Sequence, residues 1–287
     1  MNTLTARPSI AAAQSDVVRL SYPAQGVAVV TLDRPASMNA LNGALIEALP
    51  ATFAELAGDE RVKVVIVTGA GRGFCSGADL SALTDGLRSG PVVEFMRLVG
   101  RPLVALAHLP QVTIAAVNGP AIGAGWGLAM ACDLRISSTT ARFGATFVRM
   151  ALGPDYGLSC TLPAAVGRER ALELLMTGRI IDAAEADRIG LTAAVAEDAL
   201  HEALDRAKDI ATAPCRTLRS IKATLQRSAG VGIDDVIDEI EAEAQAALFE
   251  HPDFVTDAAA WTQRHQHRSD QPAAQRPAWS VEPSGSL

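Results

Sequence analysis

The segment "GPAIGAGWGLAMACD" (119–133) has an unusual composition for a core segment. It is rich in glycine and alanine, and its only charged residue is the last one. It continues from "VTIAAVNG" (112–119), an unbroken apolar run that is typical of a strand buried on both faces. A turn so poor in side chains, directly after a buried strand, indicates that main-chain N–H groups approach a partner closely.

Apolar runs and helical spacings alternate on both sides of this segment. Strands are predicted at 17–22, 27–32, 62–69 and 133–138, the first two joined by the hairpin signal "PAQG". Helices are predicted at 45–59, where Pro50 suggests a kink or break, and at 91–109. This alternation predicts an α/β fold built from βαβ units. After residue 198 the pattern is helical only, and it includes a helix at 234–249.

The sequence therefore predicts four regions. These are a flexible N-terminus (1–15), an α/β core (16–198), a C-terminal helical region (199–268) and a disordered Pro/Gln/Ser-rich tail (269–287).

Composition excludes several classes of protein. Of 287 residues, 49% are hydrophobic and 20% charged, and the net charge of −7 argues against nucleic-acid or membrane-surface binding. The longest apolar region, 103–132, is interrupted by polar residues and proline, so no membrane span is predicted. The four cysteines form no CxxC pair and no signal peptide is evident, so reduced thiols and a cytoplasmic location are expected. "HQH" (265–267) is interpreted as solvated, and no metal is expected.

A second glycine-rich turn, "GAGRGFCSGADL" (69–80), also follows a buried strand. Two such turns facing one another would offer a pair of N–H donors to one oxygen, as in an oxyanion hole. The simpler alternative is that the glycines only permit tight turns. A dinucleotide site is disfavoured because glycines at 69, 71 and 73 do not fit GxGxxG, and Tyr-x-x-x-Lys is absent.

Six ordered motifs connect the chain to a known family. The chain resembles the enoyl-CoA hydratase/isomerase, or crotonase, superfamily from about residue 17 to 265, through "RPASMNALN" (34–42), "GRGFCSGADL" (71–80), "PQVTIAAVNGPAIGAG" (110–125), "MACDLRISSTTARFG" (130–144), "LGPDYG" (152–157) and "ALELLMTGRIIDAAEADRIGL" (171–191). Together they are specific for the superfamily but not for one reaction.

The resemblance implies a crotonase-like spiral of ββα units with a C-terminal helical region, assembled as a homotrimer or hexamer. The expected substrate is an acyl-CoA thioester, so that coenzyme A enters as part of the substrate and no separate cofactor is needed. The thioester oxygen would lie between the main-chain N–H groups of Ala78 and Ala124. The positions expected to bind CoA or substrate are Ser37, Met38, Ala40, Ser76, Ala78, Asp79, Leu80, Gly123, Trp126 and Phe147. For Asp79, a helix N-cap is the alternative interpretation.

The chain departs from the hydratase pattern at two positions. Hydratases of the family use two glutamates, and the corresponding residues here are Gly127 and Phe147. One acid remains at a position where isomerases of the family carry a catalytic aspartate, namely Asp155. Its alternative role is a Pro-Asp turn or a helix N-cap. Apolar neighbours, expected to be Trp126, Phe147, Met150 and Leu152, would raise its pKa.

A single base suits an isomerase, because it can remove a proton from one carbon and return it two carbons along. The sequence therefore predicts a Δ3,Δ2-type enoyl-CoA isomerase using Asp155. The alternatives are a hydratase with an atypical acid/base and a non-catalytic acyl-CoA-binding paralogue. A dehalogenase is disfavoured, because Phe147 and Gly100 occupy the positions of its Trp and His. Asp85, Glu94 and Arg149 are secondary candidates for assisting chemistry or binding.

Overall fold

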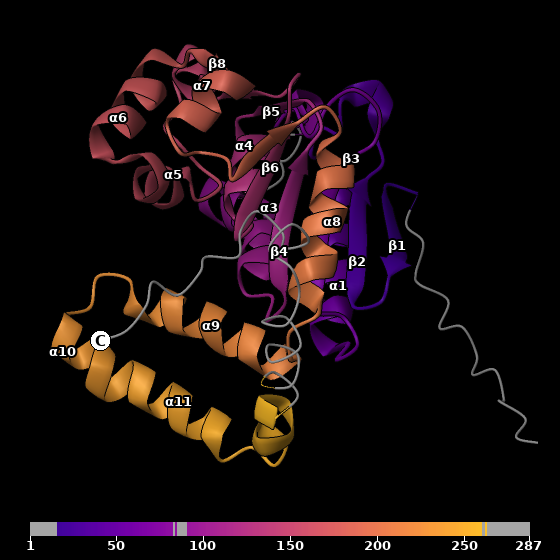
Figure 1. The fold of residues 1–287 in the computed structure, drawn as a ribbon. Helices are drawn as coiled ribbons and strands as arrows, with labels where there is room; N and C mark the ends of the chain where they lie inside the picture. Colours follow the sequence, from indigo (N-terminus) through magenta and orange to yellow (C-terminus); the bar gives the residue numbers. More distant parts are fainter. Residues whose placement is uncertain (1–15, 83, 85–90, 260–261, 263–287) are drawn as a thin grey trace, which may run out of the picture. The chain divides into compact units, whose positions relative to one another are not determined.

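The computed structural model describes residues 16–82, 84, 91–259 and 262 (Figure 1). The predicted flexible N-terminus and disordered tail lie outside these residues. The chain divides into two compact units, Met1–Lys222 and Ala223–Leu287. The predicted division between core and helical region, at 198/199, lies within the first of these units.

The main sheet of the first unit has the strand order β1-β2-β3-β4-β6-β9. β1 (Val18–Ala24) forms an antiparallel hairpin with β2 (Val27–Leu32), as "PAQG" predicts. The following pairs are parallel, through β3 (Val64–Gly69), β4 (Val112–Val117), β6 (Leu134–Ser138) and β9 (Ala194–Ala196). Every residue of β3 is buried, as expected for a continuous apolar run in a parallel sheet.

A smaller sheet has the order β5-β7-β8, with β5 (Pro120–Ile122), β7 (Arg142–Gly144) and β8 (Ile180–Asp182). β5 and β7 are parallel, and β7 and β8 are antiparallel. The segment 119–133 thus divides into β5, a turn at Gly123 and helix α4 (Ala124–Met130). Because β5 and α4 are both short, the sequence pattern did not separate them.

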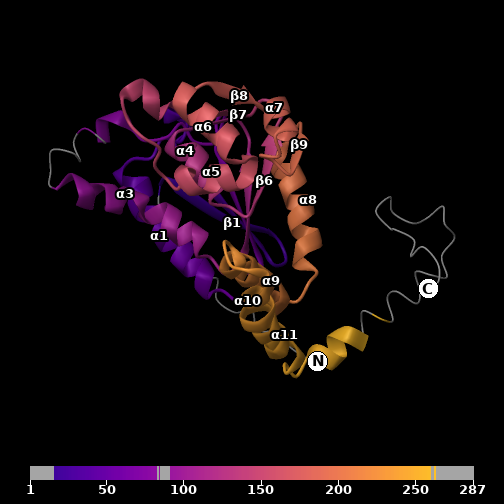
Figure 2. The same ribbon diagram turned by 90° about the vertical axis from the view of Figure 1, so that its left-hand side faces the viewer.

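Helices cover both faces of the main sheet, so successive side chains of its central strands point alternately into two hydrophobic cores. Val30, Val65 and Ala115 face the larger core, which also holds buried residues of α1 (Gly43–Gly58) and α3 (Val92–Ala107). Val29, Ile66 and Ile114 face α8 (Ala199–Ala211). Figure 2 shows the sheet between α1 and α3 on one side and α8 on the other.

α8 belongs to the first unit because of its alanine stripe. Ala199, Ala203 and Ala207 lie on one face of the helix at a spacing of four residues, and each is at most 1% exposed. Small side chains let the helix approach the sheet closely. The helical sequence pattern assigned this segment to the C-terminal region, but such a pattern does not reveal that the helix packs on the sheet.

The remaining elements of the first unit are mostly helical. They comprise η1 (Pro35–Ser37), η2 (Thr146–Met150), α5 (Leu158–Val166), α6 (Arg168–Thr177), α7 (Ala183–Arg188) and most of α9 (Cys215–Ser228). α1 continues through Pro50, so of the two expected effects of this proline, a kink or a break, the break is wrong. Its start is fixed by Asn42, whose side chain accepts a hydrogen bond from the Leu45 N–H (3.1 Å).

The second unit contains α10 (Ile233–Asp235), the π-helical turn η3 (Val236–Glu241) and α11 (Ala242–Phe249). These successive elements confirm the helix predicted at 234–249. Among the described residues, no helix combines the length and apolar character needed to cross a bilayer.

Candidate active site

The two glycine-rich turns meet in the first unit. The N–H groups of Phe74 and Cys75 both donate to the Pro120 carbonyl (3.1 Å each), and the Ile122 N–H donates to the Cys75 carbonyl (2.9 Å). Glycine is required at the contact: a Cβ built on Gly77 (φ +97°) would stand 2.8 Å from the Ile122 oxygen, and one on Gly125 only 2.1 Å from the Cys75 oxygen. The sequence prediction that the two turns face one another therefore agrees with the geometry.

The main-chain N–H groups of Ala78 and Ala124 lie at this junction. On either side of Ala78, the Leu41 N–H donates to Gly77 (2.8 Å) and the Asp79 N–H donates to Leu41 (2.9 Å). Ala124 is the first residue of α4, where the N–H has no partner within the helix. Within the described part of the chain, neither N–H has an acceptor, and both alanines line one pocket.

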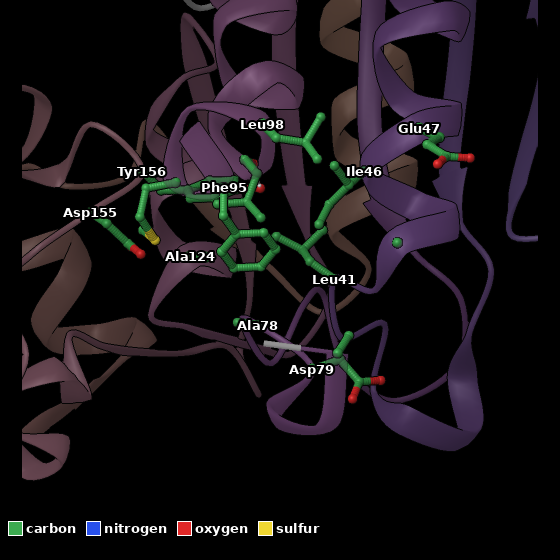
Figure 3. Close-up of a pocket in the computed structure, with 14 residues that line it drawn as sticks. Leu41, Ile46, Glu47, Ala78, Asp79, Phe95, Leu98, Ala124, Asp155 and Tyr156 are labelled. Carbon is green, nitrogen blue, oxygen red and sulfur yellow. Dashed lines mark hydrogen bonds between the residues drawn. The ribbon is translucent and has the colours of Figure 1, made fainter. Parts of the chain in front are cut away.

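This pocket has a volume of about 130 Å³ and is lined mostly by apolar side chains (Figure 3). Ala78, Ala124 and Asp155, three residues that the sequence singled out, all line it. The complete lining is Leu41, Gly43, Ile46, Glu47, Ala78, Asp79, Ala82, Phe95, Met96, Leu98, Val99, Ala124, Asp155 and Tyr156.

The Asp155 carboxyl group has little hydrogen bonding to its surroundings. Among the described residues, its Oδ1 atom is buried and has no hydrogen-bond partner. Burial raises the pKa of Asp155 to about 6, and only a hydrogen bond from its own main chain opposes this shift. Such a pKa lets the carboxylate exist at neutral pH while remaining a competent proton acceptor.

The N-cap alternative for Asp155 is not supported. α5 begins at Leu158, its N-cap residue is Gly157, and no side chain caps it. The turn interpretation does hold, since the Leu158 N–H donates to the Asp155 carbonyl (3.1 Å). The main chain of Asp155 thus forms the turn, while its carboxyl group faces the pocket.

The apolar surroundings of Asp155 differ from those expected. Trp126 is 0% exposed and packs against Phe143, with ring centroids 5.8 Å apart, and Phe147 lies beside Gly123. Neither lines the pocket, nor does Gly123, and Met150 and Leu152 are about half exposed. The apolar neighbours come instead from α3 and from Tyr156. Trp126 was expected at the site because a large aromatic residue beside a glycine-rich turn suggests a binding surface. In the structure its side chain packs in the hydrophobic core.

Asp79 lines the pocket and also begins a helical segment. It immediately precedes the helical residues 80–82, and it pairs with Arg34 (3.1 Å). A hydrogen bond from Ser81, followed by the bond to Arg34 and one from the Ala82 N–H, lowers the pKa of Asp79. The N-cap interpretation and the pocket position are therefore both compatible with the structure.

The other residues expected to bind CoA do not line this pocket. They belong to two neighbouring segments, in which the Ser76 N–H donates to the Met38 carbonyl (2.9 Å) and the Ser76 hydroxyl to the Ser37 carbonyl (3.2 Å). Met38 has a left-handed conformation (φ 49°), and Leu80 is 61% exposed. Ala40 is buried.

The apolar wall of the pocket was not predicted from the sequence. It comes from α1, α3 and the segment just before α1, through Leu41, Ile46, Phe95, Met96, Leu98 and Val99. Helical spacing identifies an apolar stripe but does not reveal whether it faces a core or a cavity. Glu47 lies at the opposite end of the pocket from Asp155 (Figure 3).

Gly127 has no room for a side chain. A Cβ built there would stand 2.4 Å from both the Cβ and the carbonyl oxygen of Tyr156. The turn that carries Asp155 therefore occupies the space that a side chain at position 127 would need.

Secondary candidates contribute little to this pocket. Glu94 is exposed in the first turn of α3, Arg149 lies in η2, and neither is among the lining residues. Asp85 and "HQH" (265–267) lie outside the described residues. Within the described ranges, His, Cys, Asp and Glu side chains form no group of three that is suited to hold a metal.

Comparison with known proteins identifies the family. The family model for enoyl-CoA hydratase/isomerase matches residues 23–267. EchA12 of Mycobacterium leprae, described as a probable enoyl-CoA hydratase, is 38% identical over 82% of this chain and 82% of its own length. The crystal structure of an enoyl-CoA hydratase from Bacillus anthracis superposes with a TM-score of 0.81 (30% identity, 86% of this chain and 96% of that chain).

A monofunctional enoyl-CoA isomerase from Mycobacterium smegmatis is also similar, with a TM-score of 0.67 and 36% identity over 78% of this chain and 99% of that chain. The fold is thus that of the crotonase-type enzymes. The chain belongs to the enoyl-CoA hydratase/isomerase family.

Proposed function

We propose that this enzyme is an enoyl-CoA isomerase of the Δ3,Δ2 type, with Asp155 as its acid/base. The observation that carries the proposal is that, within the described part of the chain, one pocket is lined by Asp155, whose Oδ1 atom has no hydrogen-bond partner, and by Ala78 and Ala124, whose main-chain N–H groups have no acceptor. The acyl-CoA thioester supplies coenzyme A, and no separate cofactor takes part.

The proposed reaction is a proton shuttle. The Asp155 carboxylate removes a proton from the carbon next to the thioester carbonyl, and the electron pair moves to the carbonyl oxygen to give a dienolate. The N–H groups of Ala78 and Ala124 donate to that oxygen, and the loss of one such donor typically costs about 3 kcal/mol in the barrier. Protonated Asp155 then returns the proton two carbons along, so that no water enters the reaction.

The number of available carboxyl groups favours isomerisation over hydration. In the family pattern, hydration uses two carboxylates, and position 127 has no space for one of them. Of the other acids that line the pocket, Asp79 is paired with Arg34 and Ser81, while Glu47 is exposed at the opposite end. One base is sufficient for a proton shuttle, whereas hydration must also activate water.

The hydratase names of the relatives make hydration the competing function, and a non-catalytic acyl-CoA-binding protein is the third possibility. Purified protein is incubated with 3-enoyl-CoA and 2-enoyl-CoA, and double-bond migration and hydration are measured separately. Isomerisation that is abolished in Asp155→Asn, with thioester binding retained, is the expected result. Rapid hydration with little isomerisation would favour the hydratase, and binding without either reaction would favour the paralogue.

Assembly and location are part of the proposal. Exposed apolar side chains of η2, α6 and β8, namely Val148, Met150, Met176 and Ile180, support assembly into a homotrimer or hexamer. Light scattering coupled to size-exclusion chromatography distinguishes these states from a monomer. All four cysteines are free thiols, which supports a reducing compartment such as the cytoplasm.

A further inference from the structure

The turn that carries Asp155 has an unusual main chain. Tyr156 (φ 48°) and Gly157 (φ 70°, ψ 0°) are consecutive left-handed residues, and the Leu158 N–H closes the turn onto the Asp155 carbonyl (3.1 Å). Left-handed conformations at both central positions define the mirror image of a common turn, for which glycine and asparagine are the favoured residues. A tyrosine persists there only where its surroundings determine the conformation.

α3 holds the tyrosine from one side. Its hydroxyl group donates a hydrogen bond to the Val99 carbonyl (2.5 Å), and the residue is 8% exposed. Burial raises the pKa of the Tyr156 hydroxyl, and the neighbouring Cys75 and Asp155 raise it further, so the group remains a protonated donor. Gly157 packs beside Leu103, since a Cβ built on it would stand 3.1 Å from the Leu103 Cδ2 atom.

α4 holds the same turn from the other side. Gly127 packs so closely against the Cβ and carbonyl of Tyr156 that even a methyl group would displace one of the two segments. The turn is thus confined between α3 and α4.

The Asp155 carboxyl group depends on this confinement. Its Oδ1 atom has no hydrogen-bond partner among the described residues, and the bond that lowers its pKa comes from its own main chain. The position of the carboxyl group is therefore set by the turn and not by partner side chains. Figure 3 shows Asp155 and Tyr156 together at one end of the pocket, near Ala124.

We propose that Tyr156 is a positioning residue for the isomerisation: its left-handed main chain against Gly127 and its hydroxyl bond to Val99 hold the Asp155 carboxyl group in the pocket that Ala78 and Ala124 line. This inference rests on the proposed function, because Tyr156 acts through Asp155.

Tyr156→Phe tests the hydroxyl bond while it preserves the ring. We expect kcat for isomerisation to fall about tenfold, with KM changed less than about twofold, because misplacement of a reacting group affects the chemical step more than binding. We also expect the acid limb of the kcat–pH profile to move to lower pH. A loosened turn admits water to Asp155, and the pKa then falls toward its ordinary value. Tyr22→Phe, at a 51% exposed position on β1, is the matched control and should behave as wild type.

Gly127→Ala tests the opposite contact and leaves the hydroxyl group in place. It should also lower kcat and shift the acid limb in the same direction. All variants are assayed at a temperature at which circular dichroism shows them folded, and their thermal unfolding is recorded.

A Tyr156→Phe or Gly127→Ala protein with wild-type kcat and an unmoved acid limb would overturn the inference, even if its unfolding temperature had dropped. Asp155→Asn separates this failure from failure of the proposed function. If Asp155→Asn isomerises normally, the proposed acid/base is wrong. If it is inactive while both other variants are unchanged, only the role of Tyr156 is wrong.

Discussion

A Cβ atom built on Gly77 would stand 3.6 Å from the main-chain nitrogen of Ala124, although the two residues lie 47 positions apart in the sequence. The same atom would lie 2.8 Å from the Ile122 carbonyl oxygen. Because position 77 carries no side chain, the two turns can approach closely, and the N–H groups of Ala78 and Ala124 come to one pocket.

Gly77→Ala should therefore nearly abolish isomerisation. The methyl group conflicts with the Ile122 carbonyl, and φ +97° is unfavourable for alanine. Displacing one donor of the pair should lower kcat/KM by a factor of about 100 to 1,000, measured with 3-enoyl-CoA. Gly100→Ala is the control, because among the described residues no atom outside its own stretch of α3 lies within 4 Å of its Cβ position. That variant should keep full activity, and equal losses in both variants would contradict the argument.

Asp155→Asn should make the protein more stable at alkaline pH. The pKa of Asp155 in the folded state, about 6, lies above its ordinary value of 3.8. The neutral carboxyl group therefore favours folding fully below about pH 4, and this contribution is lost as pH rises through about 6. Asparagine stays neutral, so the variant should exceed wild type by about 1–2 kcal/mol at about pH 8, a value reduced for solvent access to the carboxyl. Urea unfolding measures the difference, which should vanish near pH 4.

Asp79→Asn should change the stability of the protein in the opposite direction to Asp155→Asn. Hydrogen bonds from Ser81 and Arg34 hold the pKa of Asp79 below its usual value, so its charged form stabilises the folded state. Asp79→Asn should lower stability at neutral pH and lose that effect as pH falls through the folded-state pKa. If Asp79→Asn were more stable than wild type at neutral pH, the substitution would act through something other than the loss of the carboxylate charge.

Isomerisation itself should require ionised Asp155. Since the carboxylate is the form that accepts the proton, kcat should fall as pH decreases through about 6, with a slope of one proton. A pH series of initial rates with saturating 3-enoyl-CoA measures the limb. A limb near the ordinary aspartate value would show that Asp155 is solvated in the enzyme–substrate complex.

Phe95→Ala should change which acyl chains are accepted. Phe95 lines the pocket from α3, and removal of its ring enlarges the apolar space beside Asp155. The ratio of kcat/KM for a long to a short 3-enoyl-CoA should rise about tenfold. Val93→Ala on the same helix is the control, because Val93 is 62% exposed and does not line the pocket. An unchanged ratio in Phe95→Ala would place the acyl chain elsewhere.

Lys222→Met should destabilise the first unit. The Lys222 ammonium pairs with Asp133 (2.8 Å) and donates to the Gln111 carbonyl (2.9 Å), and its side chain is 8% exposed. Removal of one partner of such a pair typically costs about 3 kcal/mol. Chemical unfolding should detect this loss, whereas Lys208→Met, at an exposed pair with Asp205, should change stability by less than about 1 kcal/mol.

Local pattern predicted the framework because each framework element carries its own signal. The apolar runs of β2, β3 and β4 are too continuous for surface strands, and the glycine-rich turns that follow β3 and β4 supply Ala78 and Ala124. The resemblance then directed attention to Asp155, which lies in the same pocket.

What could not be predicted depends on long-range packing. Phe95 and Ile46 are ordinary helical apolar residues in sequence, and only the approach of α1 to α3 makes them a pocket wall. Trp126 was expected at the site, but its side chain is buried in the hydrophobic core. Tyr156 gave no signal at all, because its left-handed conformation is imposed by contacts with α3 and α4 that are distant in the chain.

The use of main-chain donors has a consequence for how mutations are tolerated. Almost any residue at position 78 or 124 still carries an N–H, but only Ala78 is exposed, whereas Ala124 is 3% exposed and packs in the core, so only the residue at position 78 is freely replaceable. Their neighbours Gly77, Gly125 and Gly127 carry no functional atom, yet each fills a space that admits no Cβ without displacing main chain. A saturation-mutagenesis map of this region should therefore show a permissive position at the donor residue 78 and an intolerant one at Gly77 beside it.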